Sequence, residues 1–351
     1  SIEMYRYIGN KKKLLPYIMA STQEMIGKTG TVVDLMAGTG LVAAEYRKMG
    51  YAVIASDMMT YSKWHLITQI MMDREPTFDK LKISSCYDNK YLSVLDYLNN
   101  LEPIEGYFFR EFSPAGTPAN GVASRKYFSA ENACKIDAIR EKINDWIASD
   151  SLSEKEEAVL KHSLIMAVNT VANISGTYGY YLSELKRNAL DSISLLPVQF
   201  SAGNIQNNRV IQGFAEDIAK DITADLCYMD PPYIKRQYAA NYHILETIAR
   251  GDYPVAQGKS GLRDWWDQHS KFCTKTKGLQ SFEKVVSEMN CRNFIISYSE
   301  DGLFPLETLV ELLKKYGEVD VEFIDYSRFR SNQSKLPLKL NEYMIKLRKA
   351  D

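Results

Sequence analysis

The run Ala224-Asp225-Leu226-Cys227-Tyr228-Met229 leads directly into the tetrapeptide Asp230-Pro231-Pro232-Tyr233. A short apolar run that is rich in β-forming residues and ends at proline is typical of a buried strand. The two prolines fix φ and lack amide donors, so the chain leaves the sheet in a rigid turn. This turn would present a carboxylate, two carbonyls and an aromatic ring at the edge where open α/β sheets bind ligands. For the tetrapeptide alone, an ordinary strand-terminating turn is the alternative.

A second part of the chain has the pattern of a nucleotide-binding βαβ unit. Residues 31–36 are predicted to form a strand, the turn Ala37-Gly38-Thr39-Gly40 follows, and residues 41–49 are predicted to be helical. Glycines in such a turn let a ligand approach the backbone and the free N–H groups of the helix. The next predicted strand, residues 52–56, ends at Asp57, where an acid would bind ribose hydroxyls. Two structural alternatives stay open, because Asp34 could cap the turn and Asp57 could cap the helix around residues 63–72.

The remaining pattern predicts one discontinuous α/β domain with an insertion. Alternation of strands and helices is lost between about residues 60 and 200 and returns with four predicted strands at 209–214, 294–299, 319–325 and 342–347. The insertion contains helical patterns at 131–147 and 153–174, and Ser153-Glu154-Lys155-Glu156 is a capping-box start for the second. We therefore expect a catalytic domain of residues 1–60 and 202–351 and an inserted, mainly helical domain of residues 61–201.

Composition limits the class of protein. The formal charge of −1 argues against a globally basic surface, so any nucleic-acid binding has to come from local clusters. The five cysteines are scattered without a Cys-x-x-Cys pair, which favours neither a zinc site nor a disulfide framework and suits a reducing cytoplasm. No stretch has the roughly 20 apolar residues of a membrane span, and no signal peptide is recognised. We expect no metal and no membrane contact.

Local clusters of charge and aromatic residues predict a nucleic-acid groove. Residues 5–18 carry four basic residues and no acid, and we expect them to form a loop that closes over an acidic or phosphate-bearing ligand. Residues 235–277 carry eight basic and four acidic residues, and residues 325–349 carry seven and two. Aromatic stretches in the insertion suit base stacking, although packing of a helical domain explains them equally well. The expected nucleic-acid contacts are Lys13, Arg125, Lys126, Tyr178, Lys235, Arg236, Lys259, Arg263, Arg328 and Arg330.

Taken in order, these motifs resemble the Dam-like α group of DNA adenine methyltransferases, which depend on S-adenosylmethionine. In that group Gly-x-Lys-x-x-Leu-Leu-Pro comes first, here Gly9 through Pro16. Asp-x-Phe-x-Gly-x-Gly, a target-recognition insertion and Asp-Pro-Pro-Tyr then follow. The chain departs from the family at Met36, where Phe is usual, an apolar swap that conserves volume. The resemblance implies a Rossmann-like methyltransferase sheet with residues 61–201 as the target-recognition domain.

The resemblance also implies roles for individual residues. The methionine end of S-adenosylmethionine would lie near Gly9, Lys11, Asp34 and Asp230, its ribose on Asp57, and its adenine ring near Met58 and Phe214. Tyr7, Met36, Gly38 and Gly40 complete the expected cofactor site. Asp230, Pro231, Pro232 and Tyr233 are the expected catalytic residues.

The chemistry of an exocyclic amine explains why these residue types suit it. Its lone pair is delocalised into the ring, and a carboxylate and a carbonyl that accept its two hydrogens direct the lone pair toward the methyl donor. Asp230 and the Pro231 carbonyl fit those roles, and Tyr233 would stack on a base flipped out of double-stranded DNA. Alternatives are the 4-amino group of cytosine, adenine in RNA, and a nucleic-acid-binding module without catalysis. The expected setting is the prokaryotic cytoplasm and its nucleoid, in epigenetic marking or in restriction-modification beside a separate cognate endonuclease.

Overall fold

The computed structural model describes residues 8–84, 87–231, 237–324 and 342–351. Its centre is a seven-stranded sheet with the strand order β3-β2-β1-β4-β5-β7-β6. Strands β1 to β5 are parallel, and β7 runs antiparallel to both β5 and β6. The bounds are β1 Thr31–Asp34, β2 Ala52–Asp57, β3 Arg209–Gln212, β4 Leu226–Met229, β5 Asn293–Ser299, β6 Gly317–Ile324 and β7 Glu342–Lys349. The expected Rossmann-like α/β sheet is confirmed, with small differences at strand ends.

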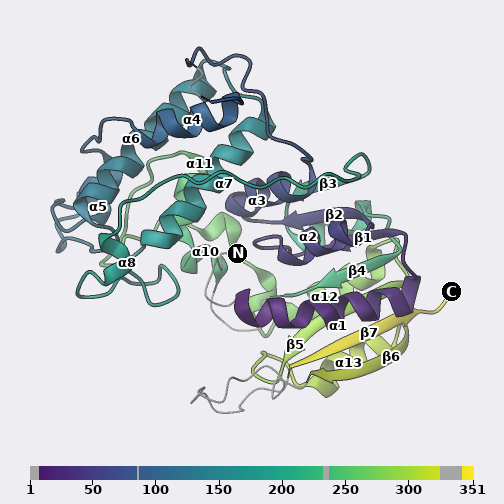
Figure 1. The fold of residues 1–351 in the computed structure, drawn as a ribbon. Coiled ribbons are helices and arrows are strands. Elements are labelled where there is room, and N and C mark those ends of the chain that lie inside the picture. Colours follow the sequence, from purple (N-terminus) through teal and green to yellow (C-terminus); the bar gives the residue numbers. More distant parts are fainter. Residues whose placement is uncertain (1–7, 85–86, 232–236, 325–341) are drawn as a thin grey trace, which may run out of the picture.

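Alternating side chains of the central strands enter two different cores. Val32 of β1 packs with Leu14, Ile18 and Tyr46, which come from α1 (Ile8–Ile26) and α2 (Leu41–Lys48). Val33, the next residue, packs into the opposite core with helices α9 (Ala215–Ile218), α12 (Gly278–Glu288) and α13 (Leu306–Lys314). Because side chains of a strand point alternately to its two faces, a sheet covered on both faces needs apolar residues at every position. Figure 1 shows α1 and α12 on the two sides of the sheet.

Helix α1 corrects the expectation of a loop at the start of the chain. From Ile8 the backbone is helical, and Pro16 lies inside the helix. The decisive signal is the spacing of Leu14, Ile18 and Met19, which lie on one face and are buried against the sheet. The glycine and the lysines favour a loop, but lysines are also compatible with the exposed face of an amphipathic helix.

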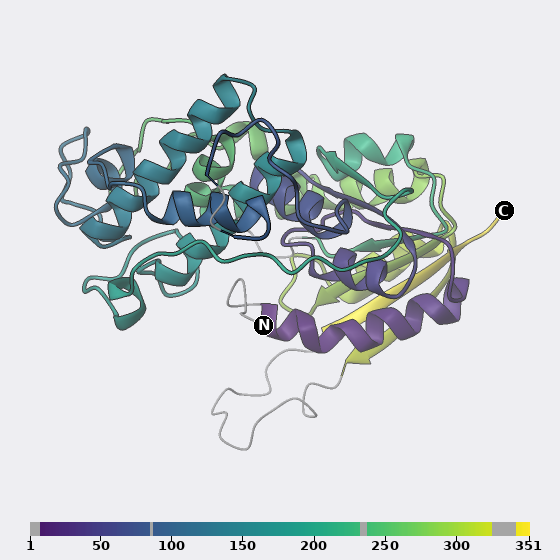
Figure 2. The same ribbon diagram turned by 45° about the horizontal axis from the view of Figure 1, so that its top comes forward.

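A helical part lies at one end of the sheet, as Figures 1 and 2 show. Its helices are α3 Thr60–Ile70, α4 Lys90–Asn99, α5 Tyr107–Phe112, α6 Ala130–Ala148, α7 Glu154–Val171 and α8 Arg187–Leu190. The predicted helices 131–147 and 153–174 correspond to α6 and α7, and the capping box between Ser153 and Glu156 is present. Two more helices, α10 (Tyr238–Asn241) and α11 (His243–Arg250), contribute to the same hydrophobic core although they follow β4. The limits 61–201 for this domain stay a prediction.

Candidate active site

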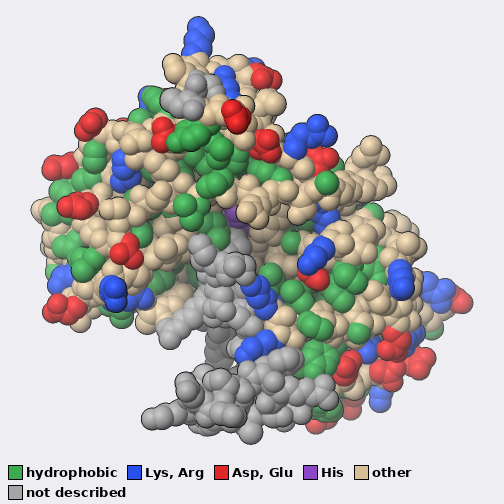
Figure 3. Space-filling view, in the orientation of Figure 1, with side chains coloured by type: hydrophobic (Ala, Val, Ile, Leu, Met, Phe, Trp, Pro, Cys, Tyr) green, Lys and Arg blue, Asp and Glu red, His purple; other side chains and the backbone are tan. Residues whose placement is uncertain are grey.

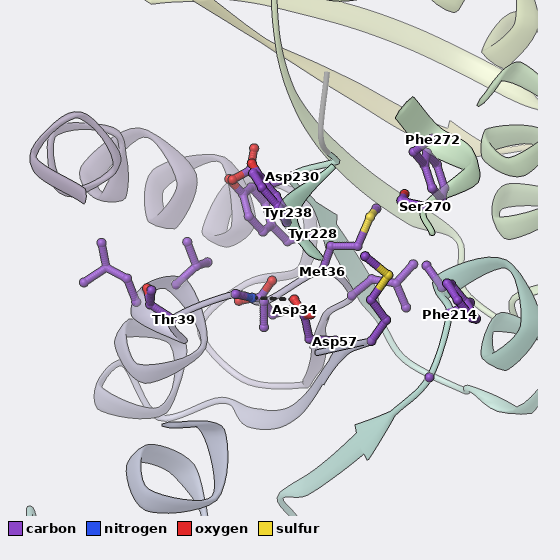
Figure 4. Close-up of a pocket in the computed structure, with 18 of the residues that line it drawn as sticks. Asp34, Met36, Thr39, Asp57, Phe214, Tyr228, Asp230, Tyr238, Ser270 and Phe272 are labelled. Carbon is purple, nitrogen blue, oxygen red and sulfur yellow. Dashed lines mark hydrogen bonds between the residues drawn. The ribbon is translucent and has the colours of Figure 1, made fainter. Parts of the chain in front are cut away.

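A pocket lies at the carboxyl ends of β1, β2 and β4. Strand order reverses here, because the chain continues from β1 to β2 on one side and returns to β4 on the other, which is where open α/β sheets bind ligands. Figure 4 shows Asp230, Tyr228 and Tyr238 together, Met36, Phe214, Ser270 and Phe272 farther along, and Asp34 and Asp57 between the two groups. The expected residues that line the pocket are Lys11, Asp34, Met36, Gly38, Asp57, Met58, Phe214 and Asp230.

The turn after β1 is held by hydrogen bonds to β2. The N–H of Ala37 donates to the carbonyl of Ser56 at 2.8 Å, and the N–H of Gly38 donates to Oδ2 of Asp57 at 2.8 Å. Gly38 and Gly40 have φ of 56° and 86°, in the left-handed region that glycine adopts without strain. Gly38 lines the pocket, whereas a Cβ on Gly40 would meet the side chain of Gln69 on α3 at 2.8 Å. Gly40 therefore lets α3 pack closely, and the described pocket does not include it.

Asp57 uses both carboxylate oxygens within the protein. Oδ2 accepts from Gly38, and Oδ1 accepts from the N–H of Met59 at 2.9 Å. Burial raises the pKa of Asp57 to about 6, even though hydrogen bonds from Met59 and Gly38 oppose the rise. The residue in the N-cap position of α3 is Met59, so Asp57 is not that helix's N-cap residue. Its carboxylate lines the pocket and retains lone pairs for a ligand hydroxyl.

Asp34 is buried with an incomplete set of hydrogen bonds. Its side chain lines the pocket, the residue is 1% exposed, and Oδ2 has no hydrogen-bond partner among the described residues. Burial, together with the nearby Asp230 and Asp57, raises its pKa to about 8 despite the opposing charge of Lys11. The N–H groups of Ala37, Gly38 and Gly40 donate to Ser56, Asp57 and Ala37, so none of these three turn amides is capped by the Asp34 carboxylate. A buried acceptor without a partner in a pocket suits a ligand that brings a donor, above all a cationic amine.

The end of β4 carries a charged pair. Lys11 on α1 forms an ion pair with Asp230, and its Nζ lies 3.4 Å from the hydroxyl of Tyr228. That hydroxyl is 2.8 Å from Oγ of Ser297 on β5, which fixes the tyrosine ring inside the sheet edge. Pro231 is buried directly after Asp230. The structure thus brings the first expected motif to the last one, over a separation of 219 residues.

Several expected site residues are outside this description. Pro232 and Tyr233 of the catalytic motif and Tyr7 of the cofactor site lie outside the described residues. Gly9 lies in the first turn of α1, where only the backbone helix is described. Lys235, Arg236, Arg328 and Arg330 of the expected nucleic-acid contacts also lie outside the described residues. Their roles stay predictions from the sequence.

Three expected nucleic-acid contacts are inside the protein, which corrects their assignment. Arg125 is fully buried, donates to the carbonyl of Gly258 at 2.8 Å and pairs with Glu111 at 3.1 Å. Arg263 is 6% exposed and binds Asp252 through both terminal nitrogens at 2.9 and 2.8 Å. Tyr178 is fully buried, and its hydroxyl donates to Asn169. A side chain enclosed in this way stabilises the helical part and is not placed to reach a phosphate.

The other described basic candidates reach solvent. Lys259 is exposed, and Lys126 and Lys13 are half-buried. Lys126 donates to the carbonyl of Ser183 at 3.0 Å. On the face in Figure 3, basic and acidic side chains are mixed over both parts of the molecule, and basic groups also lie beside the grey central region.

Sequence reasoning missed several residues that line the pocket. Tyr238, Ser270 and Phe272 come from the stretch after the catalytic motif, which was interpreted only as a basic segment. Leu41 and Val42 come from the start of α2, and Glu216 from α9. Leu41 and Val42 directly follow the glycine turn, so the order of motifs could have indicated them as pocket residues. Nothing in the local pattern around Ser270 or Phe272 indicates a pocket. Their placement depends on how the loop after α11 packs.

Comparison with known families decides the family. The model of the D12 class N6 adenine-specific DNA methyltransferases matches residues 7–316. The chain belongs to the D12 family. The match covers the Lys11, Asp34, Asp57 and Asp230 positions that form the pocket. The expected resemblance is therefore confirmed at the level of the family.

Individual methyltransferases and modification methylases align over most of the chain. Type II methyltransferase M.NlaIII of Neisseria lactamica is 31% identical over 332 residues, which are 93% of each protein. Modification methylase StsI of Streptococcus sanguinis is 34% identical over 333 residues, 93% of this chain and 49% of that protein. Type II methyltransferase M.FokI of Planomicrobium okeanokoites is 34% identical over 349 residues, 98% of this chain and 52% of that protein. The chain spans about half the length of the last two relatives.

Solved structures resemble the fold only distantly. TehB from Haemophilus influenzae has a TM-score of 0.33 and 8% identity, and covers 99% of this chain and 68% of that chain. A class I S-adenosylmethionine-dependent methyltransferase from Listeria monocytogenes has a TM-score of 0.34 and 6% identity, and covers 97% of this chain and 60% of that chain. Scores of this size carry no argument about function.

Within residues 8–84, 87–231, 237–324 and 342–351, no group of three or more His, Cys, Asp or Glu side chains is placed to hold a metal ion. No helix in the same ranges has the length and apolar character that would let it cross a membrane.

Proposed function

We propose that the chain transfers a methyl group from S-adenosylmethionine to the 6-amino group of an adenine that is flipped out of double-stranded DNA. The observation that carries the proposal is one pocket in a D12 family member that holds Asp34, with its unpartnered carboxylate oxygen, together with Asp57 and Asp230. Two separate acids for a cofactor and a third for the reacting amine are the set that such a transfer needs. The type II modification methylases among the relatives support DNA as the substrate.

The residues of the pocket fit S-adenosylmethionine by their chemistry. Asp34 would accept from the ammonium group of the methionine end, which would complete its hydrogen bonds and favour its ionised form. Asp57 would accept from the ribose hydroxyls, and Met36, Met58 and Phe214 would surround the adenine ring with apolar and polarisable atoms. When bound, the cofactor supplies an electrophilic methyl group on a sulfonium.

Asp230 and Pro231 are proposed to handle the amine of the target base. The carboxylate of Asp230 and the carbonyl of Pro231 would each accept one amine hydrogen, which directs the nitrogen lone pair toward the cofactor side of the pocket. Lys11 neutralises Asp230 before a base arrives. The incoming amine would replace the ammonium as a donor, so the carboxylate stays hydrogen-bonded throughout. Tyr233 is proposed to stack on the flipped base, a role that rests on the sequence motif alone.

The same proposal includes a cellular setting. Type II relatives suggest restriction-modification, in which a separate cognate endonuclease would cut DNA that this chain has not methylated. Action would take place in the prokaryotic cytoplasm, on the nucleoid. Sequencing modified bases in a plasmid from cells that express the chain would reveal a methylated motif, and a neighbouring endonuclease of the same specificity would support restriction-modification over epigenetic marking.

Nucleoside analysis tests the reaction. The purified chain, the cofactor and unmethylated duplex DNA should yield N6-methyladenine, and Asp230→Ala should yield none. If the product is N4-methylcytosine, the substrate base is cytosine and not adenine. If RNA but not DNA is methylated, the substrate is RNA. Cofactor and DNA binding with no methylated product would instead support a nucleic-acid-binding module.

A further inference from the structure

The N-terminus of α3 is capped by a residue from a distant helix. Met59 occupies the N-cap position, and its side chain, a weak acceptor at best, makes no capping hydrogen bond. The first N–H groups of α3, those of Thr60 and Tyr61, donate instead to the two oxygens of Glu246 on α11, at 3.2 and 3.1 Å. A negative group at this end of a helix satisfies orphan donors and is favoured by the helix dipole.

Glu246 is fully buried and receives two more donors. Its Oε2 accepts from Nε of Arg250 at 2.9 Å and from Nε2 of Gln268 at 2.7 Å. Four donors compensate the loss of water around the carboxylate, which would otherwise be costly to bury. The group is therefore a fixed point inside the protein, and it lies next to the turn that carries Asp57 and Met58.

Gln268 connects Glu246 to the pocket by hydrogen bonds. Its side-chain amide, 5% exposed as a residue, donates both to Glu246 and to the backbone carbonyl of Met58 at 3.2 Å. Met58 lines the pocket from the turn after β2, and Ser270 and Phe272 line it from the segment that contains Gln268. One amide thus joins two segments that form the pocket.

The segment of Gln268 is itself anchored on its other side. Gln237 accepts from the N–H of Ser270 at 2.7 Å and donates to the carbonyl of Ser270 at 3.0 Å. These two hydrogen bonds satisfy both backbone polar groups of Ser270, as pairing with a neighbouring β-strand would. Gln268 joins the Met58 turn directly to the Ser270 segment. The Met58 carbonyl also accepts from Gln212 of β3 at 3.3 Å, but that bond ties the turn to the sheet and not to the Ser270 segment.

We propose that Gln268, held by Glu246, is a positioning residue that sets the adenine end of the cofactor pocket by tying the Met58 turn to the segment of Ser270 and Phe272. This inference rests on the proposed function, because it assumes that the pocket takes S-adenosylmethionine with its adenine near Met58. Neither residue touches the reacting atoms. Their effect is on cofactor affinity, and chemistry at saturating cofactor is left intact.

The test replaces the amide with groups of similar length. Gln268→Met cannot donate and loses both bonds. Because only the bond to Met58 ties the pocket, the Kd for S-adenosylmethionine should rise roughly fivefold, which corresponds to about 1 kcal/mol for one buried hydrogen bond. Gln268→Lys can donate to both acceptors and should restore most of the affinity. The kcat of Gln268→Met at saturating cofactor should stay within about twofold of the parent. Calorimetry gives the Kd, and initial rates give kcat and KM.

Arg250→Met is the matched control. It also removes one donor to Oε2 of Glu246, but among the described residues the other hydrogen bond of Arg250 goes to the exposed Asp267 at 3.5 Å and not to Met58. It should lower thermal stability and leave the cofactor Kd unchanged. Equal increases of the Kd in Arg250→Met and Gln268→Met would show that general loosening around Glu246 is responsible, and would overturn the proposal.

A second ligand locates the effect within the pocket. 5′-Methylthioadenosine keeps the adenine and ribose but lacks the amino acid, so Gln268→Met should weaken it by the same factor as S-adenosylmethionine. If S-adenosylmethionine alone is weakened, the tie does not act at the adenine end. If the parent protein binds neither ligand, the proposed function fails. Parent binding with an unchanged Kd in Gln268→Met overturns only the positioning role.

Discussion

Oδ2 of Asp57 accepts the N–H of Gly38 at 2.8 Å, so the acid that ends β2 also holds the glycine turn that follows β1. The second oxygen accepts the N–H of Met59 at 2.9 Å, in the turn between β2 and α3. Asp57 is therefore both a proposed ligand for ribose and a tie between two loops. A substitution there changes the ligand contact and the shape of the site together.

Asp57 variants are expected to separate these two roles. Asp57→Ala should weaken S-adenosylmethionine binding by roughly 1.5–3 kcal/mol, as for hydrogen bonds to a charged group. Asp57→Asn keeps one acceptor for Gly38 or Met59 and should lose less affinity and less stability than Asp57→Ala. Calorimetry measures affinity, and thermal unfolding measures stability. Unchanged affinity in Asp57→Ala would remove the residue from the ribose role.

Asp34 predicts a pH dependence of stability. Its pKa is about 8 in the ligand-free fold and about 3.8 as the ordinary value, so the folded state holds a proton that the unfolded state has released between these pH values. The free energy of unfolding should therefore fall as pH rises from about 4 to about 8, and level off above. Asp34→Asn cannot ionise, so its stability relative to the parent should increase over the same range. Denaturant unfolding from pH 5 to 9 measures both.

The same variant should lose cofactor affinity, because an amide carries no charge to attract an ammonium group. If Asp34→Asn is more stable than the parent at pH 8 but binds S-adenosylmethionine more weakly, the Asp34 carboxylate serves ligand binding and lowers the stability of the ligand-free fold. A parent stability that does not change relative to Asp34→Asn between pH 5 and 8 would contradict the raised pKa.

Asp230 and Tyr233 are expected to act at different steps. Asp230→Ala should abolish methyl transfer while folding and most DNA binding remain, and Asp230→Asn should be severely slowed because it loses the charge that Lys11 and the amine recognise. Tyr233→Phe should keep most activity. Tyr233→Ala should lose both rate and capture of the flipped base, since stacking is worth about 1–3 kcal/mol.

A duplex with 2-aminopurine at the target position measures that capture by its fluorescence. Equal loss in Tyr233→Phe and Tyr233→Ala would show that the hydroxyl matters more than stacking. Methylation of DNA by Asp230→Ala would exclude the proposed role of the motif.

Lys259 and Arg125 form a contrasting pair for DNA binding. Lys259 is exposed, so if it contacts a phosphate, Lys259→Met should reduce the slope of log affinity against log salt by about one with little change in stability. Arg125 is buried and paired with Glu111, so Arg125→Met should lower stability by on the order of 3–5 kcal/mol. Fluorescence anisotropy over a salt series measures the slope. An unchanged slope in Lys259→Met would mean that this lysine is only solvated surface.

The sequence by itself determined the family, the sheet and three acids of the pocket. Strands such as Leu226–Met229 are short, apolar and punctuated by glycine or proline, and the acids that follow them lie at one edge because parallel strands end together. Lys11 was placed by its motif, although the helix around it was not foreseen. These features depend on local pattern and on the order of motifs, both of which can be read along the chain.

Only the tertiary structure decided which polar residues are ligands and which are internal supports. Arg125 and Arg263 are basic residues like Lys259, but both are buried and hydrogen-bonded within the protein, whereas Lys259 is exposed to solvent. Gln268 belongs to no motif, and it meets Glu246 and Met58 because α3, α11 and the following segment pack together. Burial and hydrogen-bond partners arise from contacts between distant segments, so a pattern of neighbours along the chain does not contain them.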